Sequence, residues 1–129
     1  HGAGDVPAIA GSDGPMDAAG AAAMPIEAWT ERELAALHAA WHVAEARRDR
    51  ALGERLRRAA SWHAANTQPD NATNHPWAIH VFVSLALEGD ADAELLAQTL
   101  LHNCHVTLGH PDLRSGFILA DAAMAVRDA

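Results

Sequence analysis

A repeat of 42 residues is the feature that most constrains how this chain of 129 residues can fold. When the sequence is displaced by 42 positions, residues 31–70 align with residues 73–112 without a gap and with seven identities. The four identities that are not alanine are His38 with His80, His63 with His105, Pro69 with Pro111 and Asp70 with Asp112. A period near 42 residues is typical of stacked helical hairpins, so the repeat predicts antiparallel helix pairs that are each closed by a polar Pro-Asp loop.

The spacing of apolar residues predicts an all-α domain with about five helices. Alanine, which has the highest helix propensity, occurs 31 times in the chain. The expected helices begin near residue 31 and continue over residues 51–65, 76–88, 91–107 and 115–127. Five helices make two and a half hairpin units, as expected for the terminal piece of a longer array.

The ends of two expected helices carry clear local signals. Thr30 followed by Glu33 matches a capping box, which predicts that the first helix starts near Glu31. Pro76 suits the first turn of the third helix, capped by Asn74 or His75. Gly89 ends that helix, and Asp90 caps the fourth.

The first 28 residues differ from the rest in composition. They combine Gly, Ala, Pro and Asp without an apolar period. We therefore expect residues 1–28 to be a flexible lead-in or linker, and residues 29–129 to form the helical-hairpin domain.

Trp and His residues gather around the loop between the second and third expected helices. The run reads Trp62-His63, Gln68-Pro69-Asp70-Asn71, Asn74-His75-Pro76-Trp77 and His80-Val81-Phe82. This run resembles a stretch near the C-terminal end of uncharacterised bacterial helical proteins. At the level of pattern, the hairpin repeat is also similar to the α/α-toroid families, which include polysaccharide-degrading and terpene-cyclising enzymes. The resemblance covers about residues 30–127 and implies a fold without an activity, because the acidic signatures of the cyclases are missing and too few hairpins are present to close a toroid.

Charge excludes several classes of partner. The net charge of −8 argues against nucleic acid and anionic membranes as partners. Residues 47–58 contain six Arg together with Asp49 and Glu54, so their net charge is +4. We interpret this stretch as a solvated helix face rather than a phosphate or partner patch. The longest apolar run, Trp77–Leu87, is shorter than the ~20 residues of a membrane span. The single Cys104 excludes an internal disulfide and, without a credible signal segment, favours a cytoplasmic protein.

Several histidines have the spacing of metal ligands. His38, His42 and Glu45 lie at positions i, i+4 and i+7 of the first expected helix, so their side chains converge on one edge. His80 on the third helix, or His105 on the fourth, could complete a site for a divalent transition metal such as Zn or Fe. The alternative is structural: His38 and His80 lie within apolar stripes, where a neutral imidazole usually bonds to a carbonyl or carboxylate.

The loop over residues 66–77 is a second candidate site. Polar groups and an aromatic platform occur together there, a mixture that suits a sugar-like or other small polar ligand. The candidate ligand-binding residues of this loop and its repeat partner are Gln68, Asp70, Asn71, Asn74, His75, Trp77, His110 and Asp112. The alternative is a pair of well-capped helix connections.

Two functional hypotheses follow from these patterns. The first is a non-enzymatic helical-repeat scaffold or binding module, part of a longer chain or a homo-oligomer, whose partner is a protein or a small polar ligand. The second is a metal-dependent hydrolase or lyase fragment that uses the histidine and carboxylate site. The first is favoured because the chain has no complete catalytic motif: no Gly-x-Ser-x-Gly elbow, phosphate-binding loop or dinucleotide fingerprint occurs.

Overall fold

The structure is a computed structural model that describes residues 13–68, 71–106 and 113–127. All regular structure within these ranges is helical, which confirms the predicted all-α fold. The elements are a short 3-10 helix η1 (Ala19–Ala22) and the α-helices α1 (Ile26–Arg47), α2 (Arg50–Asn66), α3 (Ile79–Leu87), α4 (Ala91–Val106) and α5 (Leu113–Arg127). Within the same ranges, no helix combines the length and the hydropathy that crossing a membrane requires.

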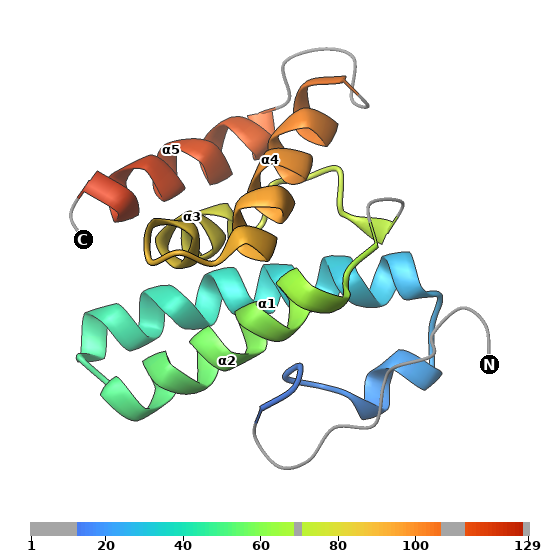
Figure 1. Cartoon of the computed structure of the whole chain (residues 1–129), viewed down its shortest axis with the longest axis horizontal. Coiled ribbons are helices and arrows are strands. Elements are labelled where there is room, and N and C mark those ends of the chain that lie inside the picture. The colour runs from blue at the N-terminus through green and yellow to red at the C-terminus, as the bar shows by residue number, and fades with distance from the viewer. Residues whose placement is uncertain (1–12, 69–70, 107–112, 128–129) are drawn as a thin grey trace.

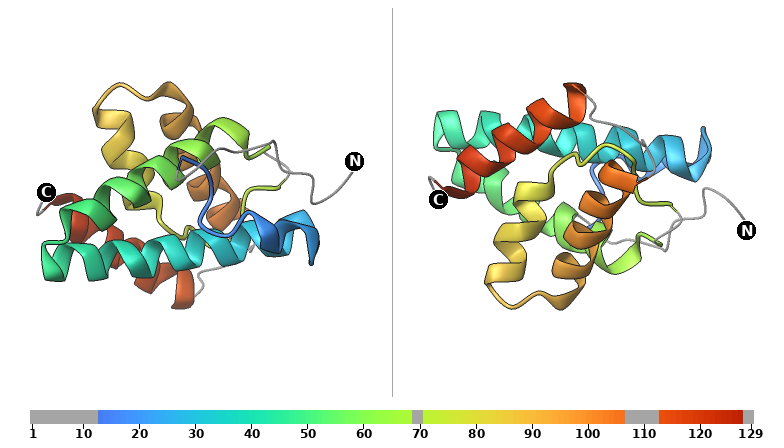
Figure 2. Two further views of the ribbon diagram at one scale, coloured as in Figure 1. Left: turned by 90° about the horizontal axis from the view of Figure 1, so that it is seen from below. Right: turned by 90° about the horizontal axis from the view of Figure 1, so that it is seen from above.

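The helices form two pairs and a fifth helix that packs against them. α1 and α2 run antiparallel, and α3 and α4 form a second pair that packs against α2 (Figure 1). α5 packs on α3 and crosses near α1 (Figure 2). α3 therefore contacts α2, α4 and α5. A helix whose sequence is apolar almost all round is typically buried on most of its surface.

One apolar core lies between these helices. It includes Leu34 and Leu37 of α1, Leu56 of α2, Phe82 of α3 and Leu100 of α4, and all are fully buried. Buried alanines such as Ala60 and Ala93 also belong to this core, where close packing leaves little room for a larger side chain. Cys104 is also buried, as expected for a core residue.

α1 begins five residues earlier than the sequence predicted. It starts at Ile26 after Pro25, whose φ of −57° suits the entry to a helix. The predicted capping box is wrong, because Thr30 is a buried residue inside α1 and Glu33 is turned inward. Long-range partners, which a local sequence pattern does not reveal, therefore determine the role of Glu33.

Glu33 holds the segment before α1 against the helices. Its side chain is 3% exposed and accepts hydrogen bonds from the backbone N–H groups of Met16 and Asp17, both at 2.9 Å. The Nε2 atom of His63 on α2 lies 2.9 Å from the same carboxylate. Burial alone would raise the pKa of Glu33, but the hydrogen bond and charge of His63, together with the two amides, hold that pKa below its usual value.

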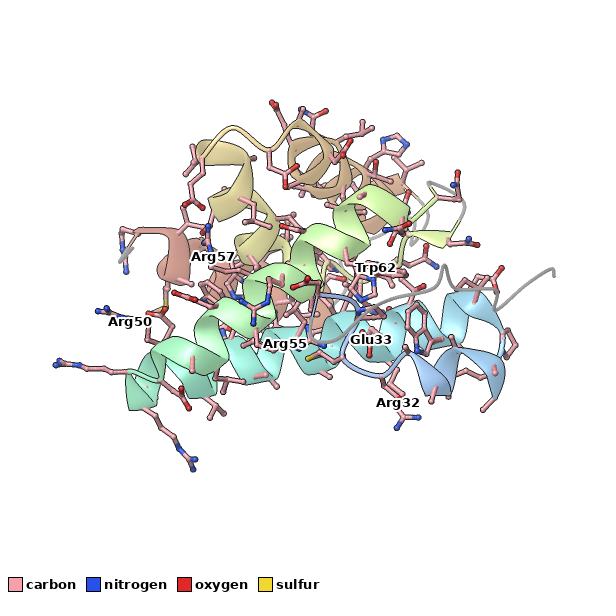
Figure 3. All side chains as sticks on the ribbon, turned by 60° about the horizontal axis from the view of Figure 1, so that its bottom comes forward. Arg32, Glu33, Arg50, Arg55, Arg57 and Trp62 are labelled. Carbon is pink, nitrogen blue, oxygen red and sulfur yellow. The ribbon has the colours of Figure 1, made fainter. Side chains whose placement is uncertain are left out.

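Further contacts extend this attachment. The indole N–H of Trp29 donates to the carbonyl of Asp17 at 2.8 Å. Arg55 of α2 donates to the carbonyls of Gly14 and Pro15 at 2.7 and 2.9 Å. Figure 3 shows Arg32 directed outward, whereas Glu33, the next residue on α1, lies inside. Residues 13–25 of the expected lead-in thus have specific partners on α1 and α2.

The turns within each helix pair follow their local chemistry. α1 ends where Arg48 takes the left-handed conformation with φ of 53°, and Asp49 then caps α2 by accepting the N–H of Leu52 at 3.0 Å. Gly89, with φ of 103°, follows α3. Asp90 accepts the N–H of Ala93 at 3.0 Å, which confirms the predicted cap of α4.

The start of α3 differs from the prediction. The helix begins at Ile79 rather than Pro76, because Ala78 adopts a left-handed conformation with φ of 60° and ψ of 16°. Neither Asn74 nor His75 caps it. The backbone N–H of Ala78 instead donates to Nδ1 of His38 on α1 at 3.1 Å.

The 42-residue repeat remains a sequence prediction. α1 and α3, which the repeat aligns, contain 22 and 9 residues. Of the repeat-equivalent pair His63 and His105, the first is buried and the second is exposed.

We expect Glu33→Gln to lower the free energy of unfolding at pH 7 by about 1–3 kcal/mol, because a neutral amide cannot accept from both backbone amides and His63. The folded pKa of Glu33 lies below its usual value of 4.5. Its stabilisation is therefore present above that value and is lost as the pH falls through the folded pKa. Urea denaturation of both proteins from pH 7 to pH 3 measures the difference, which should narrow in acid.

The exposed Glu27 on the same helix offers a matched control, Glu27→Gln, which should change stability by less than about 0.5 kcal/mol. If Glu33→Gln is as stable as the wild type across this pH range, the attachment by Glu33 contributes nothing to folding stability.

Candidate metal centre

Two helices, α1 and α5, bring two imidazoles and a carboxylate together. His38 and His42 lie one turn apart on α1, so their side chains share one face of the helix. Asp121 lies on α5, which crosses near this face. The Nε2 atoms of His38 and His42 are each 2.7 Å from the same oxygen, Oδ2 of Asp121. The ligand atoms of these three residues all lie within 4.8 Å of one another, so the group could hold a metal ion.

A third imidazole completes the cluster. The ring of His80, at the start of α3, has its centroid 4.8 Å from that of His38 and 5.2 Å from that of His42. The His38 and His42 centroids are 5.1 Å apart, so the three rings form a nearly equilateral triangle. His80 is only 1% exposed, whereas the side chain of His42 is 38% exposed. The cluster is thus closed on the α3 side and open on the side of His42.

Several ring nitrogens in this cluster are buried without a hydrogen bond. Among the described residues, neither nitrogen of His80 has a hydrogen-bond partner. Nε2 of His42 also lacks one, because its close approach to Asp121 does not have hydrogen-bond geometry. A buried polar group without a partner costs about 1–3 kcal/mol, so native proteins contain few of them. Three such atoms therefore lie within this one cluster, where a ligand could satisfy them.

The protonation states in the cluster suit a cation. Burial and the neighbouring His38 and His42 lower the pKa of His80 to about 4, so its ring is neutral at pH 7. Burial lowers the pKa of His38 as well, although Asp121 opposes this shift. Burial would raise the pKa of Asp121, but the hydrogen bond from His38 and the charge of His42 lower it. Neutral imidazoles and an ionised carboxylate are the forms that bind metal ions.

A pocket of about 320 Å³ adjoins the cluster. His42, His80 and Asp121 form part of its wall, and Trp41 and Met124 contribute apolar surface. Glu45 and Ser84 add polar groups. The open side of the cluster therefore faces a space that is large enough for a small molecule.

The predicted metal ligands are only partly brought together. His38, His42 and His80 form the cluster, whereas Glu45 lines the pocket and Asp121 supplies the carboxylate next to the imidazoles. His105 is exposed in the last turn of α4, and the ring contacts found in the described part of the chain do not link it to the cluster. Sequence reasoning missed Asp121, although it is the sole acidic residue of α5 and interrupts the otherwise apolar run over residues 117–126, a signal that could have identified it.

The predicted polar-ligand loop uses several of its groups to hold itself in place. His75 Nδ1 and Trp77 Nε1 each lie 3.1 Å from Oε1 of Glu31 on α1. The backbone N–H of Asn71 donates to the carbonyl of Gln68, and Asn74 is exposed. The remaining candidate residues of this site, Asp70, His110 and Asp112, lie outside the described residues. These contacts hold the described part of the loop against α1.

No family model, curated protein or solved structure matches this chain.

We expect His80→Leu to raise the free energy of unfolding by about 1–3 kcal/mol at pH 7 in the presence of a chelator, because it removes two buried polar atoms without partners. The pKa of His80 is about 4 when folded and usually 6.5, so the unfolded chain takes up a proton first as the pH falls. Wild-type stability should thus decline between pH 6.5 and pH 4, by on the order of 3 kcal/mol from this group.

The His80→Leu variant should lack this decline. Chemical denaturation of both proteins at several pH values provides the measurement. A variant that is less stable than the wild type at pH 7 would show that the His80 nitrogens have a partner in the metal-free protein.

Proposed function

We propose that this chain binds one divalent transition metal ion at the cluster of His38, His42, His80 and Asp121, and that the ion serves a hydrolase or lyase reaction in the adjoining pocket. One observation carries the proposal. Two imidazole Nε2 atoms converge on a single carboxylate oxygen at 2.7 Å, beside a third imidazole whose nitrogens have no hydrogen-bond partner among the described residues. Nitrogen and carboxylate donors of this kind suit Zn or Fe.

A contrast within the same protein supports this proposal over a purely structural role. Like His38, His63 is buried with Nε2 next to a carboxylate, in its case that of Glu33 at 2.9 Å. Glu33 is itself 3% exposed, whereas Asp121 is 46% exposed. The His63 pair is therefore sealed in the core, while the cluster at Asp121 opens to solvent, where an ion and a substrate have access.

The pocket supports a chemical role for the ion. If three of these side chains held the ion, a position would remain for water or substrate, and the ion would lower the pKa of a water bound there. Glu45 lines the same pocket and offers a carboxylate that can accept a proton. The volume of about 320 Å³ restricts the substrate to a small molecule or to one end of a larger one.

We expect the purified protein, free of any affinity tag, to contain one Zn or Fe ion per chain by elemental analysis. Asp121→Asn and His42→Ala should each weaken zinc binding at least tenfold, because each removes a donor atom from the cluster. His105→Ala is the matched control, since it removes an exposed histidine outside the cluster. Zinc titration by calorimetry and circular dichroism of each variant separate lost binding from lost folding.

A wild-type protein that takes up no stoichiometric metal from Zn, Fe, Mn, Ni or Cu contradicts the proposal. The helical-repeat binding module would then be the function that the sequence supports best.

A further inference from the structure

We infer that the ion in this cluster is bound by His42, His80 and Asp121, while His38 remains outside the coordination shell and positions the Asp121 carboxylate. This inference rests on the proposed function and assigns the role of each side chain within the site. It treats His38 as a positioning residue, although its Nε2 atom is as close to Asp121 as that of His42.

The backbone amide of Ala78 decides the role of His38. This N–H group can only donate, so Nδ1 of His38, 3.1 Å away, must carry its lone pair toward Ala78. A neutral imidazole has one N–H group, which is then at Nε2. Nε2 donates to Oδ2 of Asp121 at 2.7 Å. Both nitrogens of His38 are thus engaged, and no lone pair remains for an ion.

The fold makes this arrangement difficult to reverse. A histidine that binds metal through Nε2 carries its proton on Nδ1 and donates it to an acceptor. In this protein Nδ1 faces a donor, so binding through Nε2 would require either loss of the Ala78 hydrogen bond or an imidazolate. Ala78 is 0% exposed, and the bond to His38 satisfies its amide at the start of α3. Loss of that bond would leave a buried amide without a partner.

His42 and His80 present the opposite situation. Their buried nitrogens have no hydrogen-bond partner in the described part of the chain, so binding an ion breaks no bond that they make there. His80 is outside the set of ligand atoms that lie within 4.8 Å of one another, so its ring must rotate to place a nitrogen on the ion. Its centroid is 5.2 Å from that of His42, which keeps this movement local to the side chain.

Two imidazoles and one carboxylate then hold one side of the ion. The remaining positions face the pocket that His42, His80 and Asp121 line. His38, which is 7% exposed and does not line that pocket, lies behind the carboxylate. Its N–H fixes which lone pair of Asp121 is directed toward the ion.

Glutamine at position 38 provides a discriminating variant. A glutamine side chain has one acceptor and one donor, the same pattern that His38 presents to Ala78 and Asp121, but it is a poor metal ligand. We expect His38→Gln to keep zinc affinity within about threefold of the wild type, and His38→Ala to lose the 10–100-fold that is typical when a partner of a metal ligand is removed. His42→Gln and His80→Gln should each lose more than that, and His105→Gln should lose nothing.

A second measurement uses the wild type and does not depend on how the variants fold. In protein labelled with ¹⁵N histidine, long-range ¹H–¹⁵N spectra report which nitrogen of each ring carries a proton. In the zinc-loaded protein His38 should retain its Nε2–H form, whereas one nitrogen of His42 and one of His80 should show metal coordination.

The outcomes separate the two proposals. If the wild type binds zinc but His38→Gln loses it as fully as His42→Gln does, or if His38 carries its proton on Nδ1 in the loaded protein, the inference is overturned and the metal site stands. Retention of full affinity by His80→Gln also overturns it. A wild type that binds no ion overturns the proposed function, and the inference falls with it.

Discussion

The hydrogen bond from the Ala78 amide to His38 is the constraint on which the arrangement of this protein depends. This bond fixes which nitrogen of the His38 ring carries the proton. His38 lies on α1, accepts from the amide of Ala78 just before α3 through Nδ1, and donates to Asp121 on α5 through Nε2. The left-handed conformation of Ala78 directs its N–H toward α1 rather than into α3. A single side chain therefore sets how α3 and α5 meet the first helix.

The protein contains two buried pairs of histidine and carboxylate, and they have different consequences. Glu33 and His63 join α1 to α2. The Glu33 carboxylate also accepts hydrogen bonds from two backbone amides of the preceding segment, so both of its oxygens have partners. Asp121 receives one hydrogen bond from His38, and Nε2 of His42 lies 2.7 Å from the same oxygen. The pair of Glu33 and His63 holds parts of the fold together. The pair of His38 and Asp121 lies beside a pocket, and Asp121 lines that pocket.

Local sequence signals predicted the helices well and the long-range contacts poorly. Asp90 capped α4 as predicted because a cap involves only residues a few positions apart. The capping box at Thr30 failed because Glu33 found partners 16, 17 and 30 residues away, and none of these is visible in a local pattern. The i, i+4 spacing identified His38 and His42, but the carboxylate opposite them is 79 residues from His42, on a helix whose packing no periodicity determines. Burial of His38 and His80 followed from their apolar stripes.

The position of Asp121 on α5 has a consequence for how the protein is made. A ribosome synthesises all three histidines of the cluster well before α5, so the growing chain carries the imidazoles without their carboxylate. His38 has its acceptor only after α5 has docked against α1 and α3. Under the proposed function, an ion that requires Asp121 would bind only after α5 has packed against the other described helices, so metal loading would report completed folding.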